Sequence, residues 1–369
     1  MGGSAGENSG DERSLAERSV PAATSSIRAM PLKCSGKAPL SPSGSWRREG
    51  SRAGDGSQAR GQERGDELGS KDLPTVGVGI MAYNEARNIR PLLQSLIAQR
   101  TQCCRLSEIV VVASGCTDDT EAIVDQMARR DPRIRLIAQS KREGKARAIN
   151  VYFRSGETDF RILASGDTLP ADDAIESLIR PMIEDPSVGM TGGHVVPVNG
   201  DKRFIGHAVH TLWRLHHRLA SEAPKMGEIV AFRNIVKRIP EDSAVDEVSI
   251  EADVTRQGLS LKYIPEAIVK NKGPETISEF IKQRRRIHAG HLAARRVAGY
   301  VPSTMSLKRV GRVFVADAVS RPSRIAWCLG TAALEATGRM LGAYDHYVSG
   351  RSHAVWEIAV TTKDVQGNR

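Results

Sequence analysis

Short apolar runs alternate with helical patterns between residues 76 and 165, and this alternation restricts the fold more than any other feature. The runs at 76–80, 108–113, 134–138 and 160–164 are short and mostly β-branched or aliphatic, as buried strands are. Between the first two runs, apolar residues recur at helical spacing from Ile89 to Ile97. Strands joined by helices through short connections favour a parallel sheet with right-handed crossovers. We therefore expect an α/β fold.

The same kind of pattern continues beyond residue 165. Thr117 is expected to cap the helix after the second run, and Thr276 with Glu279 forms a capping box that predicts a later helix. Gly258 is expected to stop the helix before it. The remaining predicted elements are a helix near 175–182, a strand at 188–196, a helix at 205–220, a strand at 228–232, a helix opening within 240–247, and a helical region from about 313.

The first 72 residues differ in composition from the rest. They are rich in Gly, Ser, Arg and Glu and contain almost no large apolar residues. Such a segment does not bury enough apolar surface to offset the entropy lost on ordering. We expect residues 1–72 to be a disordered tail that can be deleted without loss of stability or activity.

The net charge of +10 comes largely from one stretch. Residues 279–312 contain nine Lys or Arg and a single acid, Glu279. A local excess of this kind predicts an anionic partner such as phosphate, nucleic acid or an anionic membrane surface. Phe280 and Tyr300 are the only aromatic residues there, which argues against nucleic acid. The apolar run Ile325–Leu334 is too short to span a membrane, so we expect a packed or interfacial helix.

Neither cysteine nor histidine gives a convincing metal motif. The five cysteines have no metal-ligand spacing, which favours a reducing compartment. The predicted helix at 205–220 carries four histidines but no carboxylate at ligand spacing, so a solvated or substrate-lining face is favoured over a metal site.

Asp167 is the strongest candidate for chemistry. It follows Ser165 and Gly166 directly after the fourth apolar run. Ligands of open α/β sheets collect beyond the carboxyl ends of the strands, and a carboxylate there suits a hard cation bridging two phosphates. An ordinary turn or helix-capping aspartate is the alternative.

Several short motifs, in order, resemble those of the family 2 glycosyltransferases over roughly residues 74–290. The motifs are Ala82-Tyr83-Asn84-Glu85, Ser114–Thr120, Gly144–Asn150, Ser165-Gly166-Asp167, Asp246-Glu247 and Gln283–Ile287. The last two fall where the cellulose- and hyaluronan-synthase-like members have an acidic pair and a QxxRW motif. Each motif is weak alone, but their order and spacing match the family.

The resemblance implies a GT-A fold, a mostly parallel Rossmann-like sheet, in a domain spanning 73–290, with 291–369 as a helical C-terminal extension. It implies that Asp167 holds Mg²⁺ or Mn²⁺ and that Glu247, beside Asp246, is the catalytic base. It also implies that a nucleotide sugar contacts Ala82, Tyr83, Asn84, Glu85, Ser114, Lys145, Ser165, Gly166, Gln283 and Arg286. A base opposite the leaving group implies inversion at the anomeric carbon.

The departures from the family pattern are informative. Ser165 replaces the first acid of the metal-binding DxD motif, and Glu247 is one methylene longer than the usual aspartate. Ala113-Ser114 lacks the acid that contacts the base of the nucleotide. Ile287 replaces the tryptophan of QxxRW, and no channel helices are evident, which argues against extrusion of a polymer.

The predicted function is therefore transfer of a sugar from a UDP- or GDP-linked donor to a hydroxyl acceptor. The acceptor is a glycan, a lipid-linked molecule or a small molecule, in polysaccharide, cell-envelope or glycolipid biosynthesis. The predicted location is cytoplasmic, peripheral at the inner face of the membrane. The alternatives are a nucleotide-sugar pyrophosphorylase or nucleotidyltransferase, for which a glycine-rich basic loop would be expected in place of Ala82–Glu85, and a nucleic-acid-binding protein.

Overall fold

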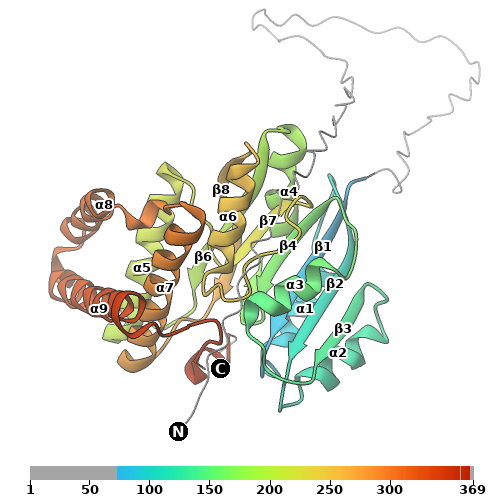
Figure 1. Cartoon of the computed structure of the whole chain (residues 1–369), viewed down its shortest axis with the longest axis horizontal. Helices are drawn as coiled ribbons and strands as arrows, with labels where there is room; N and C mark the ends of the chain where they lie inside the picture. Colours follow the sequence, from blue (N-terminus) through green and yellow to red (C-terminus); the bar gives the residue numbers. More distant parts are fainter. Residues whose placement is uncertain (1–72, 358, 366–369) are drawn as a thin grey trace, which may run out of the picture. The chain divides into compact units, whose positions relative to one another are not determined.

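The computed structural model describes residues 73–357 and 359–365. The predicted disordered tail, residues 1–72, lies outside this part of the chain. The described residues form a central sheet with helices on both faces, and further helices lie at one end (Figure 1). The expected α/β fold is confirmed.

The sheet has eight strands in the order β3-β2-β1-β4-β7-β6-β8-β5. β1 pairs in parallel with β2 and β4, and β2 pairs in parallel with β3, as the alternation predicted. β7 is antiparallel to both β4 and β6, and β5 is antiparallel to β8. The strands are β1 (Thr75–Ala82), β2 (Arg105–Ser114), β3 (Ile134–Gln139), β4 (Phe160–Ser165), β5 (Thr168–Pro170), β6 (Val188–Pro197), β7 (Ile229–Arg233) and β8 (Ser260–Asn271).

Two apolar layers hold the helices to the sheet. On one face, α1 (Ile89–Ile97), α2 (Thr120–Ala128) and α4 (Ala174–Glu184) pack on the strands. On the other face, α3 (Lys145–Phe153) and α6 (Asp246–Arg256) do so. The remaining helices are α5 (Phe204–Glu222), α7 (Ile277–Ala298), α8 (Leu307–Val319) and α9 (Ile325–Tyr344), with short turns at Ser303–Met305, Pro322–Arg324, Asp345–Ser349 and Val360–Thr362.

The sequence of β1 shows how the two faces differ. Val76, Val78 and Ile80 alternate with glycine and pack on the first face. A Cβ atom at Gly79 would lie 2.4 Å from the ring of Tyr152, which is fully buried beneath it. Glycine is therefore required there, because it lets α3 lie close to the sheet.

Two helix starts differ from the predictions. Thr117 does not cap α2, because Asp119 is the cap residue and the helix begins at Thr120. α6 begins only at Asp246, the last part of the predicted opening. Gly258 does follow the end of this helix in a left-handed conformation, with a φ of 82°.

β8 was not predicted at all. Its sequence contains Pro265 and alternates poorly, and a proline normally argues against an interior strand. The structure accommodates it through a break in register, since Gly193 pairs with Ile264 while the next residue, His194, pairs with Ile268.

The C-terminal helices pack against the end of the sheet domain. Thr276 caps α7 by accepting a hydrogen bond from the Glu279 amide, so the predicted capping box is confirmed. α7 packs along α9 and continues through residue 290, the predicted end of the catalytic domain. α5 contacts both α8 and α9. Within residues 73–357 and 359–365, no helix is both long enough and apolar enough to cross a membrane.

Candidate active site

A cavity of about 910 Å³ lies beyond the carboxyl ends of β1, β2 and β4. Helices α3, α5, α6 and α7 and the C-terminal segment 351–363 also contribute to it. Such an edge is where α/β sheets bind ligands. The predicted site residues that line the cavity are Ala82, Tyr83, Glu85, Ser114, Lys145, Ser165, Gly166, Asp167, Glu247, Gln283 and Arg286. The structure thus brings them together, while their roles stay predictions.

Asn84 and Asp246 do not line the cavity but support residues that do. Asn84 has a φ of 53°, and its side chain accepts a 2.8 Å hydrogen bond from the amide of Thr117, which joins the loops after β1 and β2. Asp246 is buried and lies 2.8 Å from Nζ of Lys145. This pairing fixes the lysine at the edge of the cavity.

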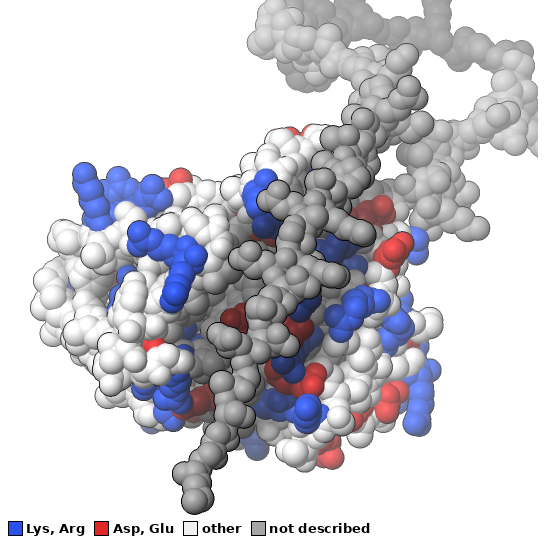
Figure 2. All heavy atoms as spheres, in the orientation of Figure 1, with Lys and Arg blue, Asp and Glu red and all other residues white. Residues whose placement is uncertain are grey.

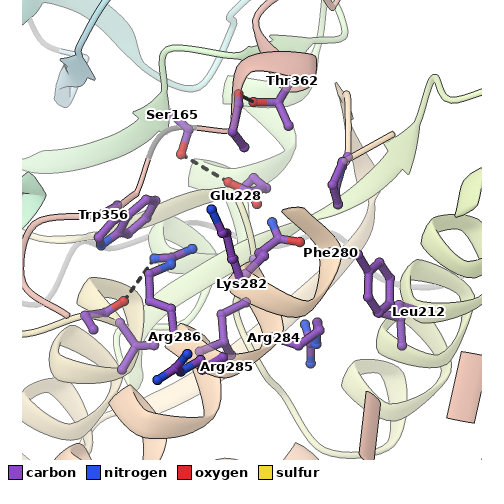
Figure 3. Close-up of a pocket in the computed structure, with 18 of the residues that line it drawn as sticks. Ser165, Leu212, Glu228, Phe280, Lys282, Arg284, Arg285, Arg286, Trp356 and Thr362 are labelled. Atoms are coloured by element: carbon purple, nitrogen blue, oxygen red, sulfur yellow. Dashed lines mark hydrogen bonds between the residues drawn. The ribbon is translucent and has the colours of Figure 1, made fainter. Parts of the chain in front are cut away.

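A group of polar residues surrounds the end of β4. The hydroxyl of Ser165 donates a 3.1 Å hydrogen bond to Glu228, which precedes β7 (Figure 3). Nζ of Lys145 donates to the same hydroxyl at 3.4 Å. Burial raises the pKa of Asp167 to about 6, and the nearby Glu85 adds to the increase. Burial and then Asp167 also raise the pKa of Glu228.

Glu85 contributes a further carboxylate from the loop after β1. Burial raises its pKa, although an ion pair with Lys363 opposes the increase. A Cβ atom at Gly166 would lie 2.8 Å from Cγ of Glu85, so glycine between Ser165 and Asp167 leaves room for this side chain. The acids around Asp167 therefore repel one another, and a cation would stabilise them.

Glu247 lies at the start of α6, and Lys225 is its closest basic partner. Nζ of Lys225 is buried and lies 3.6 Å from Glu247 and 3.5 Å from Glu251. Burial raises the pKa of Glu247 above its ordinary value, while Lys225 opposes the increase. A carboxylate with a raised pKa facing a cavity is suited to accept a proton.

Arg286 is held between the loop before α6 and an aromatic ring. Its Nη1 donates a 3.2 Å hydrogen bond to the carbonyl of Ala244, and its guanidinium lies 3.3 Å from the ring centroid of Trp356 (Figure 3). Burial lowers its pKa to about 10, so it stays cationic at neutral pH. Nζ of Lys145 lies 4.9 Å from the same ring. Trp356 thus places an aromatic ring beside Arg286, although residue 287 is isoleucine.

The described residues of the segment 351–365 contribute to the cavity lining and contact the loop Ala82–Glu85. Lys363 donates to the carbonyl of Tyr83 at 2.9 Å as well as to Glu85. Arg142 donates to the carbonyl of Trp356 and lies over the ring of Tyr83. This segment is therefore part of the site.

Three neighbouring arginines of α7 have different partners. Arg284 pairs with Glu335, and Arg285 pairs with Asp345. Arg339 also pairs with Glu335. Arg284 and Arg285 therefore fix α7 to the C-terminal helices. Arg286 instead lies near the acidic residues Asp246, Glu247 and Glu228.

Four further residues line the cavity and were not predicted from the sequence: Lys225, Glu228, Trp356 and Lys363. Glu228 is a lone acid next to a glycine just before a strand, which was a usable signal. Trp356 and Lys363 belong to a segment without periodicity, and nothing local indicates that it returns to β1.

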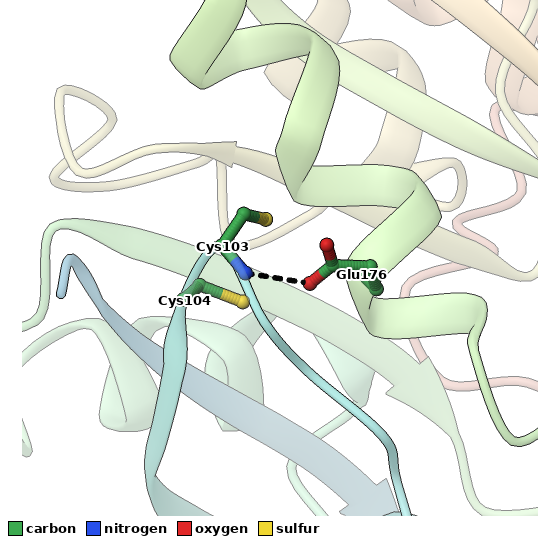
Figure 4. A group of neighbouring side chains, drawn as sticks. All are labelled: Cys103, Cys104 and Glu176. Carbon is green, nitrogen blue, oxygen red and sulfur yellow. Dashed lines mark hydrogen bonds between the residues drawn. The ribbon is translucent and has the colours of Figure 1, made fainter. Parts of the chain in front are cut away.

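Among the described residues, one group of three cysteine, histidine or acidic side chains has its ligand atoms within 4.8 Å of one another, and it lies outside the cavity. It consists of Cys103, Cys104 and Glu176 (Figure 4). The carboxylate of Glu176 already accepts hydrogen bonds from the amides of Gln102 and Cys103. This group therefore serves to hold the start of β2 to α4.

The histidines of α5 have separate partners. His210 contacts the carbonyl of Asn199 at 2.7 Å, and His217 contacts the hydroxyl of Tyr263 at 3.0 Å. His216 lines the cavity. The preference for a solvated or substrate-lining face over a metal site stays a prediction.

Comparison with known proteins identifies the class. The chain is similar to a solved mannosyltransferase from Pyrobaculum calidifontis in complex with GDP-Man and Mn²⁺, with 20% identity and a TM-score of 0.55 over 76% of this chain and 89% of that one. The fold is the GT-A fold of glycosyltransferases.

The sequence comparisons name the family. Residues 78–235 match the model of glycosyl transferase family 2. An N-acetylglucosaminyltransferase of Bradyrhizobium elkanii is 30% identical over 133 residues, which are 36% of this chain and 72% of that protein. A probable glycosyltransferase of Bacillus subtilis is 24% identical over 66% of this chain and 61% of that protein. The chain belongs to glycosyltransferase family 2, and it is a glycosyltransferase.

The ion pairs of Glu335 generate a prediction about stability and pH. Burial opposes ionisation, but Arg284 and Arg339 outweigh it and lower the pKa of Glu335 to about 2. Because the pKa of Glu335 is lowered in the folded protein, its ionised carboxylate stabilises the fold at pH values above the ordinary pKa of 4.5. This stabilisation is lost as the pH falls from 4.5 toward 2. We expect Glu335→Gln to lower the free energy of unfolding at pH 7 by roughly 2–3 kcal/mol.

Urea denaturation of both proteins at pH 7 and pH 3 measures this effect. The difference between them should shrink at the lower pH. Glu222→Gln, which removes an exposed pair with Arg312, is the control and should change little. A pH-independent difference between wild type and Glu335→Gln would contradict the interpretation.

Proposed function

We propose that the chain transfers a sugar from a UDP- or GDP-linked donor to a hydroxyl acceptor, with inversion and with a divalent cation. The observation that carries the proposal is the convergence of Asp167, Glu228 and Glu247 with Lys145 and Arg286 in one cavity at the strand ends. Membership of glycosyltransferase family 2 supports it. The complex of the structural relative with GDP-Man and Mn²⁺ is consistent with it.

The residues around β4 fit Mg²⁺ or Mn²⁺. Both ions prefer oxygen ligands, and Asp167, Glu228 and the hydroxyl of Ser165 offer only oxygen. We propose that Asp167 and Glu228 hold the ion, with Glu228 supplying the acid that is absent at position 165. A bound cation would neutralise charge that develops on the departing diphosphate.

The basic residues around the cavity fit the diphosphate itself. Arg286 offers a planar fork of donors, which matches phosphate oxygens. Lys145 lies between Asp246 and Ser165, at the N-terminus of α3. We propose that both bind the phosphates, and that Gln283, one turn before Arg286 on α7, adds a neutral donor.

Glu247 is proposed as the base that accepts the proton of the acceptor hydroxyl. The acceptor oxygen forms a bond to the anomeric carbon as the bond from that carbon to the diphosphate oxygen breaks. The proton of the hydroxyl moves to Glu247, and the nucleoside diphosphate leaves with the electron pair. One displacement of this kind inverts the anomeric configuration.

The first test removes the proposed metal ligand. We expect Asp167→Asn to lose divalent-dependent binding of UDP or GDP, because an amide does not replace an anionic ligand. Calorimetry with UDP or GDP, with and without Mn²⁺, measures the effect. Asp172→Asn is the control, since Asp172 is exposed and pairs only weakly with Arg100 at 3.7 Å. Unchanged Mn²⁺-dependent affinity in Asp167→Asn would refute the assignment.

The second test removes the proposed base. We expect Glu247→Gln to lower kcat by about 100- to 10,000-fold while donor binding is retained. Burial raises the pKa of Glu247 above the ordinary value of 4.5; Asp246 adds to the increase, and Lys225 and Lys145 oppose it. As the pH falls, the carboxylate form that accepts a proton is therefore lost at a pH higher than 4.5. The acidic limb of the pH–rate profile should therefore lie above pH 4.5 and be absent in Glu247→Gln. Glu241→Gln is the control, because Glu241 is exposed on the surface. A wild-type rate in Glu247→Gln would exclude Glu247 as the base.

We also propose that the chain binds an anionic membrane surface. Because Arg284, Arg285 and Arg286 are engaged inside the protein, the exposed basic residues of the stretch 279–312 that remain are Lys282, Arg295, Arg296, Lys308 and Arg312. Lys282 and Arg312 pair with Glu357 and Glu222. Arg295 and Arg296 lie in the last turn of α7. Each basic residue near such a surface contributes about 1 kcal/mol.

Co-sedimentation with vesicles at low and high salt tests the membrane proposal. We expect binding to vesicles that contain anionic lipid, loss of binding at high salt, and weaker binding when Arg295 and Arg296 are both replaced by glutamate. Replacement of Arg129 and Arg130, an exposed pair at the end of α2, is the control. Equal binding to neutral and anionic vesicles, or none to either, would contradict the proposal.

A further inference from the structure

The cavity continues well past the residues that the proposed reaction uses. Beyond Glu247 it extends between α5, α7, α8 and α9. Apolar side chains line much of this part, which we call the helical chamber: Leu212, Leu215 and Leu219 of α5, Phe280 of α7, and Val310 and Phe314 of α8. The ion-paired Arg284, Glu335 and Arg339 of α7 and α9 also line the cavity. Leu212 and Phe280 lie on the side of the pocket away from Trp356 and Ser165 (Figure 3).

The apolar walls of this chamber do not match a nucleotide sugar. Its phosphates, ribose and sugar are polar, and the polar end of the cavity already supplies charged partners for them. Apolar walls instead gain free energy by covering apolar groups in proportion to the area removed from water. The chamber therefore fits the other substrate, provided that this substrate carries an apolar chain.

Three buried polar atoms of residues that line the cavity lack hydrogen-bond partners among the described residues. They are Nε2 of His291, Nδ1 of His216 and Oγ1 of Thr304, and all three residues line the cavity. His291 is 7% exposed. Buried polar atoms in native proteins normally have a hydrogen-bond partner, so polar groups without one occur in the residues around the chamber. Apolar walls with a few polar points match a molecule that has a polar head and an apolar chain.

The helices around the chamber are also apolar on the outside. Leu307, Val315 and Val319 of α8 are 76%, 59% and 70% exposed, and Leu329 of α9 is 61% exposed. The surface over α8 and α9 is largely uncharged in Figure 2, with lysine and arginine side chains at its upper edge. Leu307 also lines the cavity, so this outer surface is continuous with the chamber. An apolar patch bordered by basic residues is suited to a lipid surface.

We propose that the acceptor is a membrane lipid whose apolar chain occupies the helical chamber and whose hydroxyl-bearing head reaches Glu247. The proposal rests on the proposed transferase function, because it identifies the acceptor of that reaction. The lipid enters at α8, where the exposed apolar side chains meet the membrane.

Binding of alkyl glucosides without any donor tests the chamber directly. Methyl, hexyl and octyl β-glucoside share one head and differ only in chain length, and each is used below its micelle concentration. Affinity is followed by calorimetry on the full chain and by tryptophan fluorescence, to which Trp213 and Trp356 of the cavity lining contribute. We expect octyl glucoside to bind at least about 100-fold more tightly than methyl glucoside.

Variants of α8 locate the binding. A Cβ atom at Gly311 meets nothing within 4 Å, so Gly311→Trp is expected to fold and to fill the chamber. It should weaken octyl glucoside binding by at least about tenfold, and Val310→Phe repeats the test at a second position. Ala316→Trp adds the same side chain at an exposed position of α8 outside the chamber and should bind normally.

The outcomes separate this proposal from the proposed function. Three results would contradict the proposal that an apolar chain occupies the chamber. They are equal affinity for the methyl and octyl glucosides, no binding of either, and full affinity for octyl glucoside in both Gly311→Trp and Val310→Phe. Binding of UDP or GDP with Mn²⁺ should be unchanged in Gly311→Trp. If wild type binds octyl glucoside as expected but binds neither UDP nor GDP, the proposed donor site is wrong and the proposed lipid-binding chamber is supported.

Discussion

Compensation of charge inside the cavity is the constraint on which the rest of the site depends. Carboxylates from the loops after β1 and β4, from the residue before β7 and from the start of α6 meet there. Buried charges are tolerated only when they are paired, and Lys145, Lys225 and Lys363 supply the pairing from three distant parts of the chain. The fold must therefore bring these parts together. Asp167 and Glu228, both with raised pKa, lie nearest to where a cation is proposed.

The elements that position the first half of this site were predictable because their signals are local. The Val-Gly-Val-Gly-Ile pattern of β1, the strand before Ser114 and the run before Asp167 each define a strand and its exit. Parallel strands then place their carboxyl ends at one edge, so Ala82, Ser114 and Asp167 had to converge. Glu247 and Arg286 required the family resemblance, since nothing in their own segments indicates where α6 and α7 pack.

The parts that were not predicted depend on contacts distant in sequence. β8 forms although Pro265 interrupts it, because pairing with β6 on both sides of the break outweighs the local cost. The segment that carries Trp356 and Lys363 has no regular pattern, and contacts distant in sequence, among them those with Tyr83, Glu85 and Arg142, place it at the site. The basic stretch on α7 was visible in the sequence, but composition does not distinguish Arg284, paired with Glu335, from Arg286, which faces the acids.

The central claim is that a single displacement, assisted by one base, takes place at the polar end of this cavity. The most direct test is the anomeric configuration of the first product formed from the α-linked donors UDP-glucose, UDP-N-acetylglucosamine and GDP-mannose. Proton NMR of the initial product distinguishes the two configurations. The account predicts a β-linked product from whichever donor reacts. An α-linked product would contradict it, because retention requires a mechanism that one base opposite the leaving group does not provide.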